Sequence, residues 1–80
     1  MRVLLFGRLA DAAGWRERAF DEPPATLAAL RTLLADEDAA LGEALCARGV
    51  QAAVDKEIVR GDMTLRPGCE VAFLPPMSGG

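Results

Sequence analysis

The sequence predicts a small α+β domain in which one β-sheet carries a helix across one of its faces. Short apolar runs of strand length occur at both ends and in the middle of the chain, and one segment has leucines at helical spacing. Glycine and proline pairs separate these segments. For one helical segment and four or five strands, a single sheet with the helix on one face is the compact solution.

The first quarter of the chain predicts two strands. Val3–Leu9 is short and apolar and predicts the first strand, and Asp11–Gly14 predicts a turn or one helical turn. Glu17–Phe20 predicts the returning strand. It ends before Pro23 and Pro24, because proline has no backbone N–H to donate to a neighbouring strand.

Residues 26–47 carry the strongest helix signal. Thr26 is a suitable N-cap, and Asp38 could cap a second helical piece that ends before Arg48–Gly49. The apolar residues that recur at helical spacing are Leu27, Leu30, Leu34, Leu41 and Leu45. One bent helix or two short helices between Thr26 and Ala47 both fit this pattern.

The second half of the chain predicts three further strands. They are Val50–Val54, Glu57–Val59 after a tight turn at Asp55–Lys56, and Glu70–Leu74 after turn pairs at 61–62 and 67–68. This order of elements is typical of the β-grasp (ubiquitin-like) fold. We therefore expect a mixed sheet of four to five strands with one main helix packed on one face.

Two of the predicted strands are apolar on both faces, whereas a sheet with one wet face alternates apolar and polar residues. One face would place Val3, Leu5, Val71 and Phe73 under the helix. The other would carry Leu4, Phe6, Ala72 and Leu74, with Ile58 or Val59 nearby. An exposed apolar patch of this kind predicts a partner surface. The alternatives are that chain ends, loops or a second copy cover it.

Composition excludes several classes of function. With 80 residues, 51% of them hydrophobic and 26% charged, the chain predicts a single globular domain spanning 1–80. A net charge of −3 argues against nucleic-acid binding, and the absence of histidine argues against zinc and a catalytic triad. No membrane span or signal peptide is expected, so we predict a cytoplasmic protein. We also expect no bound metal.

The last six residues, Pro75 to Gly80, predict an extended C-terminal tail. Pro75 and Pro76 cannot continue the last strand and favour an extended exit from the sheet. Six residues at about 3.3–3.6 Å each could reach about 20 Å into another protein's active site. Because Gly79 and Gly80 lack Cβ atoms, they could pass through a narrow channel.

The run Val71–Gly80, preceded by Pro67–Glu70, resembles the end of the small subunit of molybdopterin synthase, the MoaD family of ubiquitin-like sulfur carriers in the MoaD/ThiS superfamily. The opening Val3–Gly7 and the segments Ala52–Asp55 and Ile58–Val59 are similar to the same family, so the resemblance covers the whole chain. It departs at Ala10, where many relatives carry an arginine.

This resemblance implies a carrier cycle. Gly80, next to Gly79, would be adenylated with ATP by a separate E1-like (MoeB-like) enzyme, converted by a sulfur donor to a thiocarboxylate, and inserted into the large (MoaE-like) synthase subunit. The resemblance suggests an assembly of two small and two large subunits. The chain would have no catalytic machinery of its own and no cofactor besides the glycyl adenylate or thiocarboxylate. The residues expected to contact these partners are Phe6, Ile58, Leu74, Pro75, Pro76, Met77 and Ser78.

Other interpretations remain open at this stage. The chain could carry sulfur for thiamine or another pathway, could be a protein modifier attached through Gly80 to lysines, or could be an interaction module with an incidental tail. Acidic residues such as Glu17 and Glu22 could steer a basic partner. We expect Cys69 to be a packing residue rather than a persulfide carrier, and Asp36–Asp38 to be a solvated helix interruption rather than a metal site.

Overall fold

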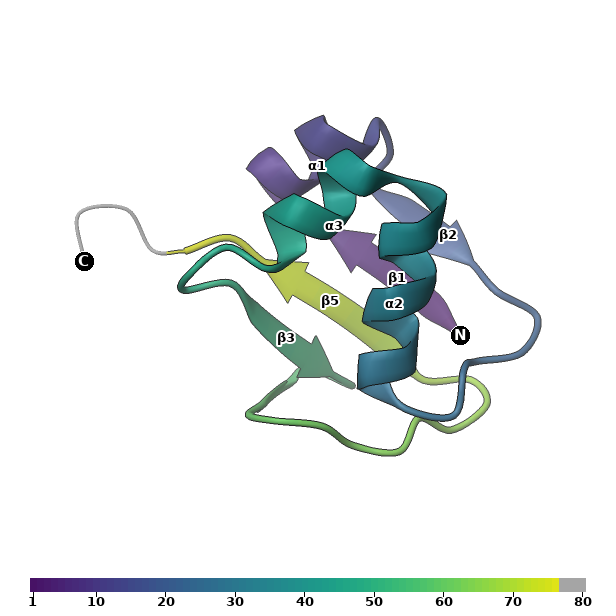
Figure 1. Ribbon diagram of the computed structural model, residues 1–80. Coiled ribbons are helices and arrows are strands. Elements are labelled where there is room, and N and C mark those ends of the chain that lie inside the picture. Colours follow the sequence, from purple (N-terminus) through teal and green to yellow (C-terminus); the bar gives the residue numbers. More distant parts are fainter. Residues whose placement is uncertain (77–80) are drawn as a thin grey trace.

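The computed structural model describes residues 1–76 as one mixed five-stranded sheet with helices on one side (Figure 1). The strands lie in the order β2-β1-β5-β3-β4. Their bounds are Arg2–Leu5 (β1), Glu17–Ala19 (β2), Gln51–Val54 (β3), Glu57–Val59 (β4) and Glu70–Leu74 (β5). The central pair, β1 and β5, is parallel and all other pairs are antiparallel, so the predicted β-grasp fold is confirmed.

Three helices accompany the sheet, whose bounds are Arg8–Ala13 (α1), Leu27–Glu37 (α2) and Ala39–Leu45 (α3). The sequence had predicted a first strand over Val3–Leu9, and this is wrong at its end. Gly7 adopts φ 57° and ψ −133°, a conformation that suits glycine and takes the chain out of the sheet. The apolar side chain of Leu9 is therefore buried from a helix rather than from a strand.

The helical segment consists of two helices, which settles the alternative that the sequence had left open. Thr26 caps α2 by accepting a hydrogen bond from the backbone N–H of Ala29 at 3.1 Å. Asp38 has an extended backbone, which ends α2, and its carboxylate accepts from the N–H groups of Ala40 and Leu41 at 3.0 and 3.2 Å. The helix therefore restarts in a new direction at Asp38.

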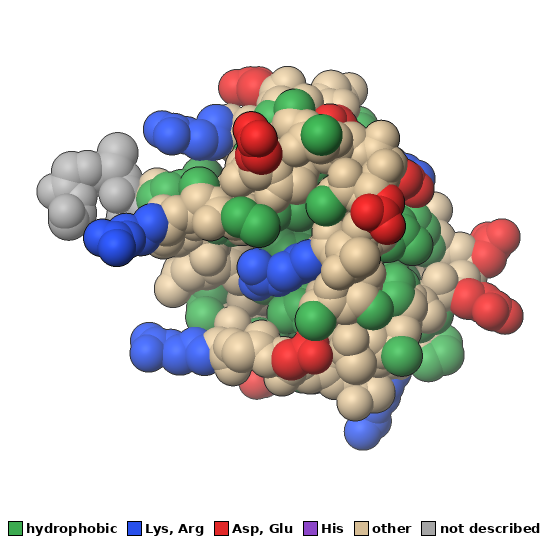
Figure 2. Space-filling view, viewed as in Figure 1, with side chains coloured by type: hydrophobic (Ala, Val, Ile, Leu, Met, Phe, Trp, Pro, Cys, Tyr) green, Lys and Arg blue, Asp and Glu red, His purple; other side chains and the backbone are tan. Residues whose placement is uncertain are grey.

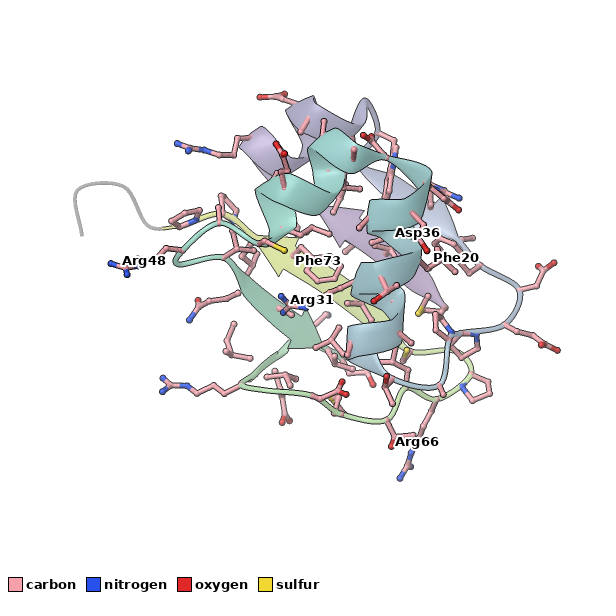
Figure 3. The ribbon with its side chains drawn as sticks, viewed as in Figure 1. Phe20, Arg31, Asp36, Arg48, Arg66 and Phe73 are labelled. Carbon is pink, nitrogen blue, oxygen red and sulfur yellow. The ribbon has the colours of Figure 1, made fainter. Side chains whose placement is uncertain are left out.

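The core lies between α2, α3 and the inner face of the sheet (Figure 1). The predicted inner-face residues are all buried, with Val3, Val71 and Phe73 fully inaccessible, and so are the leucines predicted for the helices. Arg31 on α2 lies over the ring of Phe73, with its guanidinium carbon 5.6 Å from the ring centroid (Figure 3). Among residues 1–76, no helix is long and apolar enough to cross a bilayer.

Candidate functional site

The face of the sheet that points away from the helices, here called the outer face, carries a row of apolar side chains across four strands. Leu4 pairs with Ala72, Ala72 with Ala53, and Ala53 with Ile58. Residues paired in register share a face, so this row runs from β1 to β4. Of the two residues that the sequence placed near this patch, Ile58 lies on the outer face and is 48% exposed, whereas Val59 packs against the core.

A second row extends the first toward the end of the sheet where β5 finishes. The N–H of Phe6 donates to the carbonyl of Phe73 at 3.3 Å, which continues the ladder between β1 and β5 by one residue. Phe6 is 45% exposed, and Leu74 lies two residues beyond Ala72 on the same face. The structure thus brings Phe6, Ile58 and Leu74 onto one surface. We call this surface the outer patch; its members are Leu4, Phe6, Ala53, Ile58, Ala72 and Leu74.

Charged side chains border the outer patch. Arg2 makes ion pairs with Glu17 at 3.0 Å and Glu70 at 3.6 Å. The hydrogen bond and the charge of Glu17 raise the pKa of the Arg2 guanidinium above its ordinary value, so Arg2 remains a cation. Because Arg2 and Glu17 are about half exposed, their pair contributes little to stability, and the longer pair with Glu70 contributes little as well. An apolar centre inside a polar rim is the usual anatomy of a protein interface.

A pocket of about 340 Å³ adjoins the outer patch at Phe6. Its walls come from β1, the start of α1 and the strand that follows, and they combine apolar with charged groups. The lining residues are Leu4, Leu5, Phe6, Gly7, Ala10, Asp11, Arg16 and Glu17. Sequence reasoning missed this pocket because it extended the first strand through Leu9, past the turn at Gly7 that forms one wall.

Two glycines hold the base of the tail. A Cβ atom on Gly7 would lie 3.0 Å from Cγ of Pro75, and one on Gly49 would lie 2.9 Å from Cβ of Pro76. Both glycines have positive φ, 57° and 88°, which other residues rarely adopt. Strand β5 ends at Leu74 as predicted, but Pro75 and Pro76 are half-buried rather than free of the body. The first two residues of the tail, Pro75 and Pro76, therefore have a seat on the body of the domain, formed by Gly7 and Gly49.

The remaining predicted site residues, Met77, Ser78, Gly79 and Gly80, lie outside the described residues. Of the other sequence candidates, Cys69 is buried in the core, as expected for a packing residue. In the acidic segment, Glu37 pairs with Arg18 at 2.8 Å and Asp38 caps α3. Within residues 1–76, no three His, Cys, Asp or Glu side chains cluster as metal ligands would.

Comparison with known proteins agrees with this architecture. The chain resembles the solution structure of small archaeal modifier protein 1 from Methanosarcina acetivorans, with 22% identity, a TM-score of 0.85 and coverage of 99% of this chain and 94% of that one. It also resembles the crystal structure of the protein of the same name from Haloferax volcanii, with 24% identity, a TM-score of 0.76 and coverage of 99% and 97%. At these identities the likeness establishes the fold.

The fold and the outer patch define a ubiquitin-like β-grasp protein. The ThiS family model matches residues 3–80, which is nearly the whole chain. The chain therefore belongs to the ThiS family. A search among curated proteins found no match.

Proposed function

We propose that this chain is the sulfur carrier of molybdenum cofactor biosynthesis, the small subunit of molybdopterin synthase, and that Gly80 carries the sulfur. The observation that carries the proposal is the position of the tail base beside the outer patch. Leu74 belongs to the outer patch, and the next two residues are the prolines seated on Gly7 and Gly49. A partner that covers the patch therefore stands directly next to the tail.

The chemistry requires activation, because a carboxylate is a poor electrophile. In the proposed cycle the Gly80 carboxylate attacks the α-phosphate of ATP, which forms the acyl-adenylate and releases pyrophosphate. A sulfur nucleophile then displaces AMP and leaves the thiocarboxylate. The thiocarboxylate sulfur is transferred to the pterin precursor in the large subunit, and water returns the glycyl carboxylate.

In this cycle the partner enzymes supply the catalytic groups, which agrees with the composition of the chain. The sequence has no histidine to act as a general base near neutral pH. The chain would contribute docking and the carried group, while the E1-like enzyme and the large subunit would contribute catalysis. Phe6, Ile58 and Leu74 would anchor both partners in turn, since one exposed surface serves a single partner at a time.

A second candidate is a protein modifier joined through Gly80 to lysines of other proteins. It is favoured by the solved structures that this fold resembles, which are named small archaeal modifier proteins. A third, a carrier for thiamine or another sulfur pathway, agrees with the ThiS family match. All three share adenylation of Gly80 and differ in the acceptor.

The test is intact mass spectrometry of the purified chain after incubation with ATP, a sulfide source and the adenylating enzyme of the same cell. We expect the mass to rise by the difference between sulfur and oxygen. A matched control carries one alanine after Gly80 and should stay unmodified while keeping its thermal stability. Adding the large subunit and pterin precursor should then discharge the thiocarboxylate. An unmodified wild-type chain, or an extended chain that still transfers sulfur, contradicts the proposal.

A further inference from the structure

Three arginines stand around the point where the tail leaves the body. Arg8 follows Gly7, the seat of Pro75, and Arg48 precedes Gly49, the seat of Pro76. Arg60 directly follows β4, and the register of β3 with β4 places it opposite Gln51. On its other side, Gln51 pairs with Leu74, the last residue of β5. We call Arg8, Arg48 and Arg60 the arginine collar. Three separate segments of the chain thus place a cation beside the same short stretch.

The arginine collar is available to a partner. All three side chains are exposed, and none of the ion pairs within 4.0 Å among residues 1–76 involves them. Arg2 and Arg18, in contrast, are engaged by glutamates, and Arg31 lies over Phe73. Figure 2 shows Lys and Arg side chains gathered at the end of the molecule where β5 ends, and Figure 3 places Arg48 there.

The rest of the molecule carries the opposite charge. The chain has 12 acidic and 9 basic residues, and three of the nine basic ones belong to the arginine collar. On the face shown in Figure 2, most of the acidic side chains lie over the helices and at the end opposite to the C-terminal end of β5. On this face, an acidic partner would therefore be attracted most strongly at the end of β5. Such an arrangement orients a partner during encounter.

We propose that the arginine collar docks on an acidic rim around the opening through which the adenylating enzyme receives the tail. This inference rests on the proposed function, and it adds the chemistry of the partner surface. The sequence had suggested that acidic residues steer a basic partner, whereas at the tail end the charge is the reverse. Exposed rim charges act mainly on the rate of association and its salt dependence, and much less on the chemical step.

The experiment measures adenylation as pyrophosphate release by the purified adenylating enzyme, with the full-length carrier varied at several NaCl concentrations. For the wild-type chain, kcat/KM for the carrier should fall about tenfold as salt rises from low to physiological strength and above. The double variant Arg48→Gln/Arg60→Gln should lose about tenfold at low salt and respond weakly to salt. Adding Arg8→Gln should deepen this loss, and kcat should change less than twofold in every case.

A matched control removes two cations at the other end of the sheet. Lys56 lies in the turn between β3 and β4, and Arg66 lies in the loop that leads into β5, so both are remote from Leu74. The double variant Lys56→Gln/Arg66→Gln changes the net charge equally and should keep the wild-type kcat/KM and salt response. Thermal unfolding of both double variants checks that the fold is intact.

Each other outcome overturns the inference in a recognisable way. Equal losses in the two double variants would mean a general charge effect, and wild-type behaviour of the collar variant would mean that the collar makes no contact. A raised KM for ATP in the collar variant would assign these arginines to phosphate rather than to acidic side chains. In all of these cases the proposed function stands. Only a wild-type chain that is never adenylated would overturn both the proposed function and the role of the arginine collar.

Discussion

Gly7 and Gly49 each combine a positive φ with a close approach to a proline of the tail. Glycine adopts such a φ without the steric cost that a Cβ atom brings. In both places the missing Cβ also leaves room for a proline ring. A Cβ on Gly7 would lie 3.0 Å from Pro75, and a Cβ on Gly49 would lie 2.9 Å from Pro76. These glycines therefore allow Pro75 and Pro76 to pack closely against the body of the domain.

Replacing Gly49 by alanine should separate backbone strain from tail position. Gly49→Ala adds a Cβ at φ 88° that collides with Pro76. We expect it to lower the free energy of unfolding by about 1–2 kcal/mol, because of the strained φ and the displaced proline. It should also reduce the rate of Gly80 adenylation severalfold. Urea denaturation and pyrophosphate release measure the two effects.

Gly61→Ala provides the matched control. Gly61 has nearly the same φ, 85°, but a Cβ there meets nothing within 4 Å. It should cost about 1 kcal/mol in stability from the backbone alone and leave adenylation unchanged. If the two variants slow adenylation equally, the glycine seat does not direct the tail.

At the scale of elements, one aspartate decides that the helical segment is two helices. Asp38 ends α2 with an extended backbone and begins α3 with two hydrogen bonds from its side chain. The turn lets α3 fold back against α2, where Gly42 packs on Ala35. A Cβ on Gly42 would lie 2.7 Å from that of Ala35, so glycine permits this close crossing although it weakens a helix.

Removing the Asp38 cap should destabilise the domain without changing the outer patch. Asp38→Ala loses the acceptor for the N–H groups of Ala40 and Leu41, which we expect to cost about 1 kcal/mol, within a range of about 0.5–2. Asp36→Ala is the control, because Asp36 is exposed and its side chain makes no hydrogen bond or ion pair among residues 1–76. It should change stability by less than about 0.5 kcal/mol. Equal losses in urea denaturation would contradict the role of Asp38 as the cap.

For the whole molecule, the two faces of the sheet have different surroundings. Its inner face and the helices enclose the core, whereas its outer face leaves Phe6 and Ile58 nearly half exposed. Leu74 connects this outer face to the tail. A substitution on the outer face should therefore affect partners far more than folding.

Ile58→Asp tests this separation. A charge at the β4 end of the outer patch should weaken binding of the adenylating enzyme and of the large subunit at least tenfold, since a carboxylate buried without a partner at an interface is costly. The loss of folding stability should stay near 1 kcal/mol, because the side chain is 48% exposed. Isothermal calorimetry and urea denaturation measure these quantities.

Met63→Asp is the matched control, because Met63 is also an exposed apolar residue, at 38%. It lies beside the start of α2 rather than in the outer patch, since its carbonyl accepts a hydrogen bond from the N–H of Leu27. It should leave binding of both partners unchanged. If Ile58→Asp binds as the wild type does, the outer patch is not the shared surface.

Local signals in the sequence were sufficient for most of the elements. The strand pattern, the caps at Thr26 and Asp38, and the leucine spacing each depend on residues within a few positions of one another, so the sequence predicted them correctly. The helical turn predicted at Asp11–Gly14 belongs to α1, but the sequence missed that this helix begins at Arg8, because Leu9 suits a buried strand and a buried helix equally well. Only the backbone turn at Gly7 distinguishes the two.

By itself, the sequence determined the fold class, the inner and outer faces of the central strands, and the residues proposed to meet partners. Alternation along a strand assigns each side chain to a face before any long-range contact is known. Tertiary structure alone decided what lies beside the tail: the seat formed by Gly7 and Gly49, the pocket at Phe6, and the arginine collar. The glycines and arginines of the seat and the collar are far apart in the chain, and the order in which the strands pair brings them to one end of the sheet. The pocket lies within residues 4–17, and it depends on the turn of the chain at Gly7 into α1.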